Sequence, residues 1–186
     1  HLKYCYRPPF VLFYEGDISL ISTTDNHLGV VGTREPTAFY ANKCKEIVSN
    51  LDPKIVVVSG VARGMDSIAH KAALDTNKKT IGVIGSGLDV VYPYENEKLY
   101  RELKRKGLLI TEYPPGSSPD KEHFPMRNRL ISFFSKGVFV PQAHKRSGSI
   151  ITVGYALDAG KDVYCLPSEE FENSACNSLI KDGANL

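Results

Sequence analysis

Cysteine is scarce in this sequence, and its placement matches no metal-binding or disulfide pattern. The four residues, Cys5, Cys44, Cys165 and Cys176, form neither a CxxC pair nor a cysteine–histidine ligand spacing. This scatter argues against a zinc site and against a disulfide framework. It favours a reducing compartment, and we expect a cytoplasmic protein.

The sequence also lacks long apolar runs and an excess of either charge. No apolar stretch approaches the length needed to cross a bilayer, and no signal-like leader is present, so we expect a soluble protein with no membrane partner. The 23 basic and 21 acidic residues leave a formal net charge of +2. Total charge therefore does not indicate nucleic-acid binding, and any basic surface must be local.

Motifs for cofactor binding or hydrolysis are missing as well. The GSG sequence at 85–87 continues without the third glycine of a dinucleotide-binding GxGxxG turn, and no Walker-type GxxxxGK[ST] occurs. His70, His123 and His144 have no nucleophile and orienting acid at a readable spacing, so a hydrolase triad is unsupported. We expect no catalytic residue and no cofactor.

Three acidic residues leave two interpretations open. Asp66, Asp89 and Glu112 all fall where strands end or helices begin, so they are candidates for an acidic or metal-binding group. Asp66 is equally well explained as a helix N-terminal carboxylate, and Asp89 as a turn residue. We expect no metal site.

What the sequence does contain is a repeated strand–glycine–helix unit. The chain has 186 residues, of which 42% are hydrophobic, as expected for a single domain with a sizeable core. Ile55–Leu74 shows the unit most clearly, with a β-branched run, a turn at glycines and an amphipathic segment. The pattern predicts strands over Pro8–Tyr14, Leu28–Val31, Ile55–Val58, Thr80–Ile84, Leu108–Thr111, Val138–Val140 and Asp162–Leu166. Alternating strands and helices predict an α/β, doubly wound, mostly parallel sheet with helices on both faces.

The strand-to-helix turns of such a sheet gather at its carboxyl edge, where doubly wound proteins bind ligands. Here these turns are basic although the whole chain is nearly neutral, which predicts an anionic partner. Arginine grips phosphate with two parallel N–H groups, and a serine–glycine turn adds backbone N–H and hydroxyl donors. The turn residues concerned are Gly32, Thr33, Arg34, Arg63, Lys145, Arg146, Ser147, Gly148 and Ser149.

A proline-rich loop at 112–122 precedes a predicted helix at 124–135. The loop is either a lid or binding edge, or a surface excursion. Arg127 and Arg129 near the start of the helix oppose its macrodipole, and an anion held nearby would relieve that conflict. Phe124 offers either a ring face for a nucleobase or an anchor for the core.

Taken together, several blocks resemble the DprA/Smf DNA-processing proteins of bacteria over most of the chain. The blocks are VVGTREP at 30–36, VSGVARGMDSIAHKAAL at 58–74, TIGVIGSGLDVVYPYEN at 80–96, TEYPPG at 111–116, FPMRNRLIS at 124–132 and KRSGSIITVGYALDAGKDVYCLP at 145–167. The resemblance implies an extended Rossmann-like core, with a lead-in strand and connector over 1–27 and the main sheet over 28–186. The chain opens with His1, and the helical and winged-helix-like domains that often flank this core are absent from the sequence, as expected of a piece of a longer protein.

The resemblance also implies a function without enzymatic turnover. It implies a protein that binds single-stranded DNA, protects it during natural transformation, helps to load a RecA-type recombinase and forms a homodimer. Carried over to matching positions, the DNA pocket includes Arg34, Lys145, Ser147, Gly148 and the FPMRNR segment with Phe124, Arg127, Asn128 and Arg129.

One rival function and two departures from the family pattern remain open. Lysine-decarboxylase-like phosphoribohydrolases share this architecture, which suggests a small-nucleotide enzyme or sensor, but the region RSGSIITVGYAL lacks their glutamate and Asp158 lies too far along the helix to replace it. Gln142 stands where many DprA/Smf proteins have an acidic residue, and Ser168 where they have glycine. These departures concern loop geometry more than function.

Overall fold

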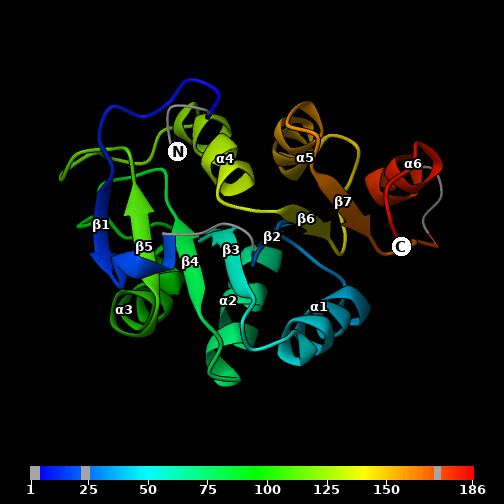
Figure 1. Ribbon diagram of the computed structural model, residues 1–186, viewed down its shortest axis with the longest axis horizontal. Helices are drawn as coiled ribbons and strands as arrows, with labels where there is room; N and C mark the ends of the chain where they lie inside the picture. Colours follow the sequence, from blue (N-terminus) through cyan, green and yellow to red (C-terminus); the bar gives the residue numbers. More distant parts are fainter. Residues whose placement is uncertain (1–4, 22–25, 170–172) are drawn as a thin grey trace.

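The computed structural model describes residues 5–21, 26–169 and 173–186. Within these ranges one seven-stranded sheet forms the middle layer, with helices packed on each face (Figure 1). The α/β, Rossmann-like, mostly parallel fold expected from the sequence is confirmed.

The strand order across the sheet is β1-β5-β4-β3-β2-β6-β7. β1 pairs with β5 in antiparallel register, and the other neighbours are parallel. Apart from β1, each strand is followed by a helix, which is the alternation that the sequence pattern predicts. The strands are β1 (Phe13–Gly16), β2 (His27–Val30), β3 (Val56–Gly60), β4 (Thr80–Val83), β5 (Leu108–Thr111), β6 (Gly137–Val140) and β7 (Asp162–Cys165).

The helices divide between the two faces. In Figure 1, α1, α2 and α3 lie below the sheet, and α4 and α5 lie above it. The short α6 packs against β7 at one end of the molecule. The helices are α1 (Ala38–Asn50), α2 (Met65–Asp75), α3 (Glu97–Lys106), α4 (His123–Phe133), α5 (Ser149–Asp158) and α6 (Ala175–Lys181), with 3-10 turns over Ile18–Ile21 and Tyr94–Asn96.

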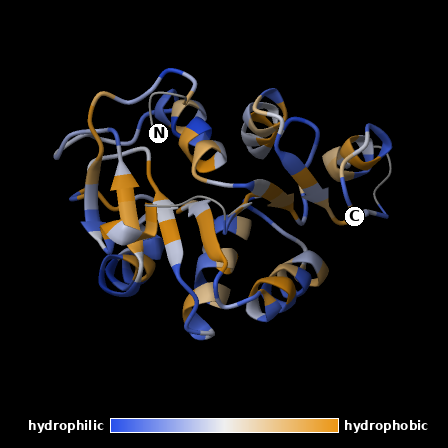
Figure 2. Cartoon of the chain, in the orientation of Figure 1, coloured by the Kyte–Doolittle hydropathy of each residue, from blue (hydrophilic) through white to orange (hydrophobic). Residues whose placement is uncertain are grey.

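The central strands are apolar because helices cover both of their faces. Val57 and Val58 of β3 are completely buried and belong to clusters on opposite sides of the sheet. On the lower face, Ala69 and Ala73 present small side chains to the strands, which allows α2 to pack closely. Figure 2 shows these strands as predominantly hydrophobic. The core thus consists of two apolar layers that hold the sheet rigidly beneath its loops.

The lead-in strand differs from the prediction. It was expected over Pro8–Tyr14, but β1 spans Phe13–Gly16. Phe13 pairs with Thr111, the last residue of β5, so β5 offers no partner to the residues before Phe13. The position of the strand is therefore set by where its partner ends.

No helix in the described ranges is long and apolar enough to span a membrane.

Candidate functional site

The topology places a crevice between β2 and β6. From β2 the chain adds β3, β4 and β5 on one side, and then returns to add β6 and β7 on the other side. The loops that follow β2 and β6 therefore diverge at the carboxyl edge. In open α/β sheets ligands bind at such a switch point.

A groove of about 690 Å³ occupies this position. Of the candidate residues predicted from the sequence, ten line it, contributed by the β2–α1 loop, the start of α4 and the turn before α5. These ten are Gly32, Thr33, Arg34, Phe124, Arg127, Asn128, Arg146, Ser147, Gly148 and Ser149. Arg63, Lys145 and Arg129 do not line this groove.

The two sides of the groove are joined by Gln142. Its backbone oxygen accepts a hydrogen bond from the Thr33 N–H (2.8 Å), and its Oε1 accepts one from the Thr37 N–H (3.0 Å). A Cβ atom at Gly32 would lie 2.8 Å from that same backbone oxygen, so glycine is required for this close approach. The residue that departs from the family pattern thus fixes the two loops to each other.

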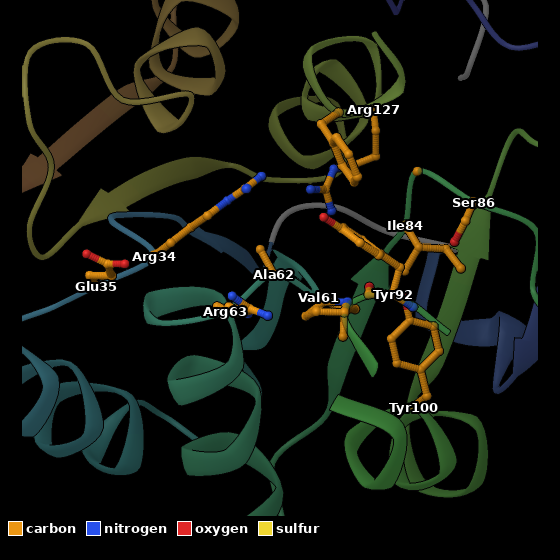
Figure 3. Close-up of a pocket in the computed structure, with 13 residues that line it drawn as sticks. Arg34, Glu35, Val61, Ala62, Arg63, Ile84, Ser86, Tyr92, Tyr100 and Arg127 are labelled. Carbon is orange, nitrogen blue, oxygen red and sulfur yellow. Dashed lines mark hydrogen bonds between the residues drawn. The ribbon is translucent and has the colours of Figure 1, made fainter. Parts of the chain in front are cut away.

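Arg34 and Phe124 form a partition at one end of the groove. Arg34 is exposed, and its Cζ lies 5.8 Å from the centroid of the Phe124 ring. Tyr92 packs on the same ring, with centroids 5.5 Å apart and planes tilted by 32°. Behind this partition is a second hollow of about 260 Å³, which Arg63 also lines (Figure 3). Phe124 is half-buried, so part of its ring faces the groove.

The turn before α5 has the form expected of an anion-binding turn. Ser147 and Ser149 place their hydroxyl oxygens 2.7 Å apart, and the Ser149 N–H donates to the Ser147 hydroxyl (3.3 Å). The amide of Asn128 donates to the Gly148 carbonyl (3.2 Å), which ties α4 to this turn. Helix α5 begins here. The N–H groups of Ile150 and Ile151 donate to the carbonyls of Ser147 and Gly148 (3.1 and 3.2 Å), so the helix offers the groove the partial positive charge of its N-terminus.

Arg127 lines the floor of the groove from an almost fully buried position. The side chain is 5% exposed, and its Nη1 donates to the carbonyl of Val83. The buried carboxylate of Asp66 is its counter-charge. Both side chains lie so close to Gly60 that a Cβ atom there would overlap them. Burial lowers the pKa of Arg127 while Asp66 opposes that change, and burial raises the pKa of Asp66. The charge conflict at the start of α4 is thus relieved by an internal carboxylate.

The guanidinium donors of Arg129 all take part in internal hydrogen bonds. Its Nη1 and Nη2 donate to the two carboxylate oxygens of Glu112 (2.8 and 2.6 Å), and Nε donates to the carbonyls of Tyr6 and Arg7 (both 3.1 Å). The side chain is 3% exposed. Although burial opposes it, the ion pair with Glu112 raises the pKa of Arg129. The structure therefore gives this predicted DNA contact an internal role, in which it fastens the N-terminal segment and the proline-rich loop to α4.

The structure separates the three acidic residues that were considered for a metal-binding group. Asp66 lies beside Arg127, Glu112 is paired with Arg129, and Asp89 accepts hydrogen bonds from the Gly116 N–H (2.8 and 3.0 Å). Asp158 is the last residue of α5, at the end remote from the groove. Each of these carboxylates thus has a structural position of its own.

Sequence reasoning missed several residues that line the groove. Lys121 lies at its edge, and Tyr92 and His144 contribute to its walls. Lys121 stands between Asp120 and Glu122, so this stretch of sequence has no net positive charge to mark it as part of a basic surface. Thr152 also lines the groove, and its completely buried hydroxyl has no hydrogen-bond partner among the described residues.

The exposed cations around the groove form no ion pair with a carboxylate of the described residues. None of the five ion pairs within the described residues includes Arg34, Lys121, Lys145 or Arg146. Arg63, in contrast, is paired with Glu95. The groove therefore combines a local excess of positive charge with an aromatic ring and a helix N-terminus.

Known proteins share the sequence and the fold of this chain. The family model described as DNA recombination-mediator protein A matches residues 1–186. The DNA processing proteins DprA of Streptococcus pneumoniae and Bacillus subtilis are 40% and 42% identical over 187 and 190 residues. These alignments cover 100% and 98% of this chain, but 66% and 62% of the relatives, so the chain spans a little under two thirds of their length.

Two solved structures are similar over nearly the whole chain. DprA from Streptococcus pneumoniae matches with a TM-score of 0.94 and 40% identity, covering 100% of this chain and 65% of that one. DNA processing protein A from Helicobacter pylori, whose structure concerns its single-stranded DNA binding mode, matches with a TM-score of 0.88 and 34% identity, covering 96% of this chain and 82% of that one. The full-length family match and these relatives lead to one conclusion: the chain belongs to the DNA recombination-mediator protein A family, the DprA/Smf family of DNA-processing proteins.

Proposed function

We propose that this chain binds single-stranded DNA along the groove at the switch point, without enzymatic turnover. The observation that carries the proposal is the partition formed by Arg34 and Phe124. There a cation that forms no ion pair with any described residue lies over a half-buried ring. Single-strand binders combine a basic groove for the backbone with aromatic faces for the bases. The groove has both features.

The phosphate contacts are assigned to the exposed cations and to the serine–glycine turn. Arg34, Lys121 and Arg146 line the groove, and Lys145 lies beside Arg146 on the same turn. The partial positive charge at the start of α5 and the Ser147 hydroxyl add further attraction for a phosphate oxygen. Because these contacts read the backbone, the binding is largely independent of base sequence and weakens as salt concentration rises.

The role of the bound strand follows from the family. We infer that the protein protects incoming DNA during natural transformation and promotes loading of a RecA-type recombinase. The family description, DNA recombination-mediator protein A, supports a part in recombination. The Helicobacter pylori relative, studied for its single-stranded DNA binding mode, supports the same ligand. We place the protein in the cytoplasm as a homodimer, the state that the family resemblance implies.

The decisive measurement is fluorescence anisotropy of a labelled single strand and of the same sequence as a duplex, each at low and moderate salt. Tighter, salt-sensitive binding of the single strand supports the proposal. Equal weak binding of both, or none, contradicts it and favours a small-nucleotide ligand. A screen with nucleoside monophosphates and diphosphates then tests that alternative directly.

A further inference from the structure

The proline-rich loop is fastened to the turn that follows β4. The Gly87 N–H donates to the carbonyl of Ser117 (2.9 Å), and both carboxylate oxygens of Asp89 accept from the N–H of Gly116 (2.8 and 3.0 Å). A Cβ at Gly87 would lie 2.7 Å from Asp89 Oδ1 and from the carbonyl oxygen of Pro114, so glycine is required for this approach. The GSG sequence, which lacks the third glycine of a dinucleotide-binding turn, thus receives a loop of the protein itself.

The part of the loop that makes these contacts is a tight turn. The Ser117 N–H donates to the carbonyl of Pro114 (3.1 Å), which closes the turn. Pro115 and Gly116 occupy its second and third positions, as a type II turn prefers, and Gly116 has the positive φ of 80° that the third position needs. Asp89 therefore holds a turn whose shape its own sequence already favours.

Both ends of the loop are fixed as well. At its start, Glu112 is paired with Arg129 of α4. Tyr113 stacks on His123, the first residue of α4, with ring centroids 3.8 Å apart and planes tilted by 20°. Near the end of the loop, the exposed Lys121 lines the groove. The loop is thus held at its ends and in its middle, and it forms a fixed rim beside the groove.

We propose that Asp89 is a positioning residue for single-strand binding, which holds this rim so that Lys121 faces the groove before a strand arrives. The inference rests on the proposed function and adds a residue that lines neither the groove nor the hollow behind the partition. A lysine on a mobile loop would lose the conformational freedom of the loop as well as its own on contacting a phosphate. The hydrogen bonds of Asp89 remove the first of these losses.

The charge of Asp89 allows the role to be tested by the sign of an effect. The side chain is exposed, and it forms no ion pair within the described residues. A carboxylate at this edge of the sheet repels the phosphates of a strand, so its removal should raise affinity if its only effect were electrostatic. Loss of the positioning contact should lower affinity instead.

The test compares Asp89→Ala, which removes the acceptor, with Asp89→Asn, which removes the charge but keeps an acceptor oxygen. Anisotropy titrations with labelled oligothymidine measure the affinity and its salt dependence. We expect Asp89→Ala to bind about fivefold more weakly than the wild type, since an exposed charge contact contributes up to about that factor. Asp89→Asn should bind at least as tightly as the wild type.

The path through Lys121 is tested by a double-mutant cycle. Lys121→Ala should lower affinity and reduce the slope of log affinity against log salt by about 0.7. In that background, Asp89→Ala should cause less than about twofold further loss, because the contact that it positions is already gone. Asp89→Ala alone should move the slope toward that of Lys121→Ala, whereas a smaller folded fraction would leave the slope unchanged.

Asp52→Ala is the matched control. Asp52 is another exposed aspartate whose carboxylate accepts a backbone N–H, that of Lys54 (2.8 Å), but it precedes β3 and lies at the opposite edge of the sheet from the groove. Its replacement should leave affinity within about twofold of the wild type, as is usual for a surface substitution.

Gly116→Val provides a second variant that changes no charge. A Cβ at Gly116 meets no neighbouring atom within 4 Å, so only the positive φ opposes a side chain there. The substitution should disturb the turn and lower affinity as Asp89→Ala does. Retained affinity in Gly116→Val, with the turn shown to be disturbed by hydrogen exchange, contradicts the inference.

Hydrogen exchange followed by mass spectrometry tests the loop in the absence of DNA. A peptide covering 113–122 should take up deuterium faster in Asp89→Ala than in Asp89→Asn or Asp52→Ala, because the Gly116 N–H loses its acceptor. Unchanged exchange in Asp89→Ala would show that Asp89 does not hold the loop.

The outcomes separate this inference from the proposed function. If the wild type binds the strand and Asp89→Ala binds equally well or better, the positioning role is refuted and single-strand binding stands. Equal losses in Asp89→Ala and Asp89→Asn, or additive losses with Lys121→Ala, also refute it. Failure of the wild type to bind any strand refutes the proposed function, and the inference with it.

Discussion

Replacing Arg129 with methionine tests whether this arginine holds the fold together or contacts DNA. Arg129→Met keeps much of the side-chain volume but removes both donors to Glu112 and the donors to the carbonyls of Tyr6, Arg7 and Met126. The Glu112 side chain is 17% exposed, so its carboxylate is left largely buried without a counter-charge. The damage is therefore structural and local to the packing of the N-terminal segment on α4.

The expected loss of stability is large for one substitution. Removing one partner of a buried ion pair costs about 3–5 kcal/mol, because the other charge remains desolvated. Typical domains have a free energy of unfolding of about 5–15 kcal/mol, so Arg129→Met should remain folded at low temperature with a much reduced margin. Adding Glu112→Gln removes the stranded charge, and the double variant should recover at least about 1 kcal/mol of that loss.

Urea unfolding followed by circular dichroism measures the stability, and anisotropy on the folded variant measures DNA affinity. Every N–H-bearing nitrogen of the Arg129 guanidinium already donates to an internal acceptor, so affinity and its salt dependence should stay within twofold of the wild type. A variant that is as stable as the wild type but loses salt-dependent binding would refute this reasoning and return Arg129 to the DNA surface.

Two further predictions concern the groove and the buried histidine. Arg34→Ala should lower single-strand affinity and reduce the slope of log affinity against log salt by about 0.7. Phe124→Ala should lower affinity without changing that slope. Titrations at several salt concentrations measure both slopes, and a changed slope in the Phe124 variant would contradict a stacking role. Burial lowers the pKa of His70 to about 4 from its usual 6.5, so its folded form stays neutral, and stability should fall as pH drops from 6.5 toward 4, by about 3 kcal/mol at most. His70→Gln should remove this pH-dependent loss of stability, measured by urea unfolding at several pH values. Burial raises the pKa of Asp66, which changes stability in the opposite direction near pH 4. The effect of His70 is therefore the difference between the free energies of unfolding of wild type and variant at each pH.

The fold was readable from the sequence because it repeats one unit. Ile55–Leu74 contains strand, turn and helix in a single stretch, and the same pattern recurs along the chain, so the parallel order and the carboxyl-edge turns follow from local signals. The lead-in strand was misplaced because no local signal fixes it. Its position depends on where β5 ends at Thr111, far along the chain.

The candidate site was only partly readable for a related reason. Arg34, Arg146 and Ser147 are on turns at the carboxyl edge, and the strand order places these turns beside the groove. Arg63 and Lys145, on turns at the same edge, do not line it. Arg127 and Arg129 are on a helix, where exposure depends on partners from elsewhere. Asp66 and Glu112, which neutralise them, come from α2 and from the loop after β5. From sequence alone a charged residue is predicted to be exposed, and only the structure identifies a buried partner.

The hydrogen bonds from Thr33 and Thr37 to Gln142 have a consequence for the timing of binding. They fasten the two loops that border the crevice, so the groove keeps its width when it is empty. A strand entering a preformed groove need not wait for a loop to order, and its arrival is governed by diffusion and by the attraction of the surrounding cations. Differences in affinity between strands should then appear in how long each one stays bound. If the proposed function is correct, a protein built in this way should capture any passing single strand quickly and retain it according to the contacts that the strand finds inside.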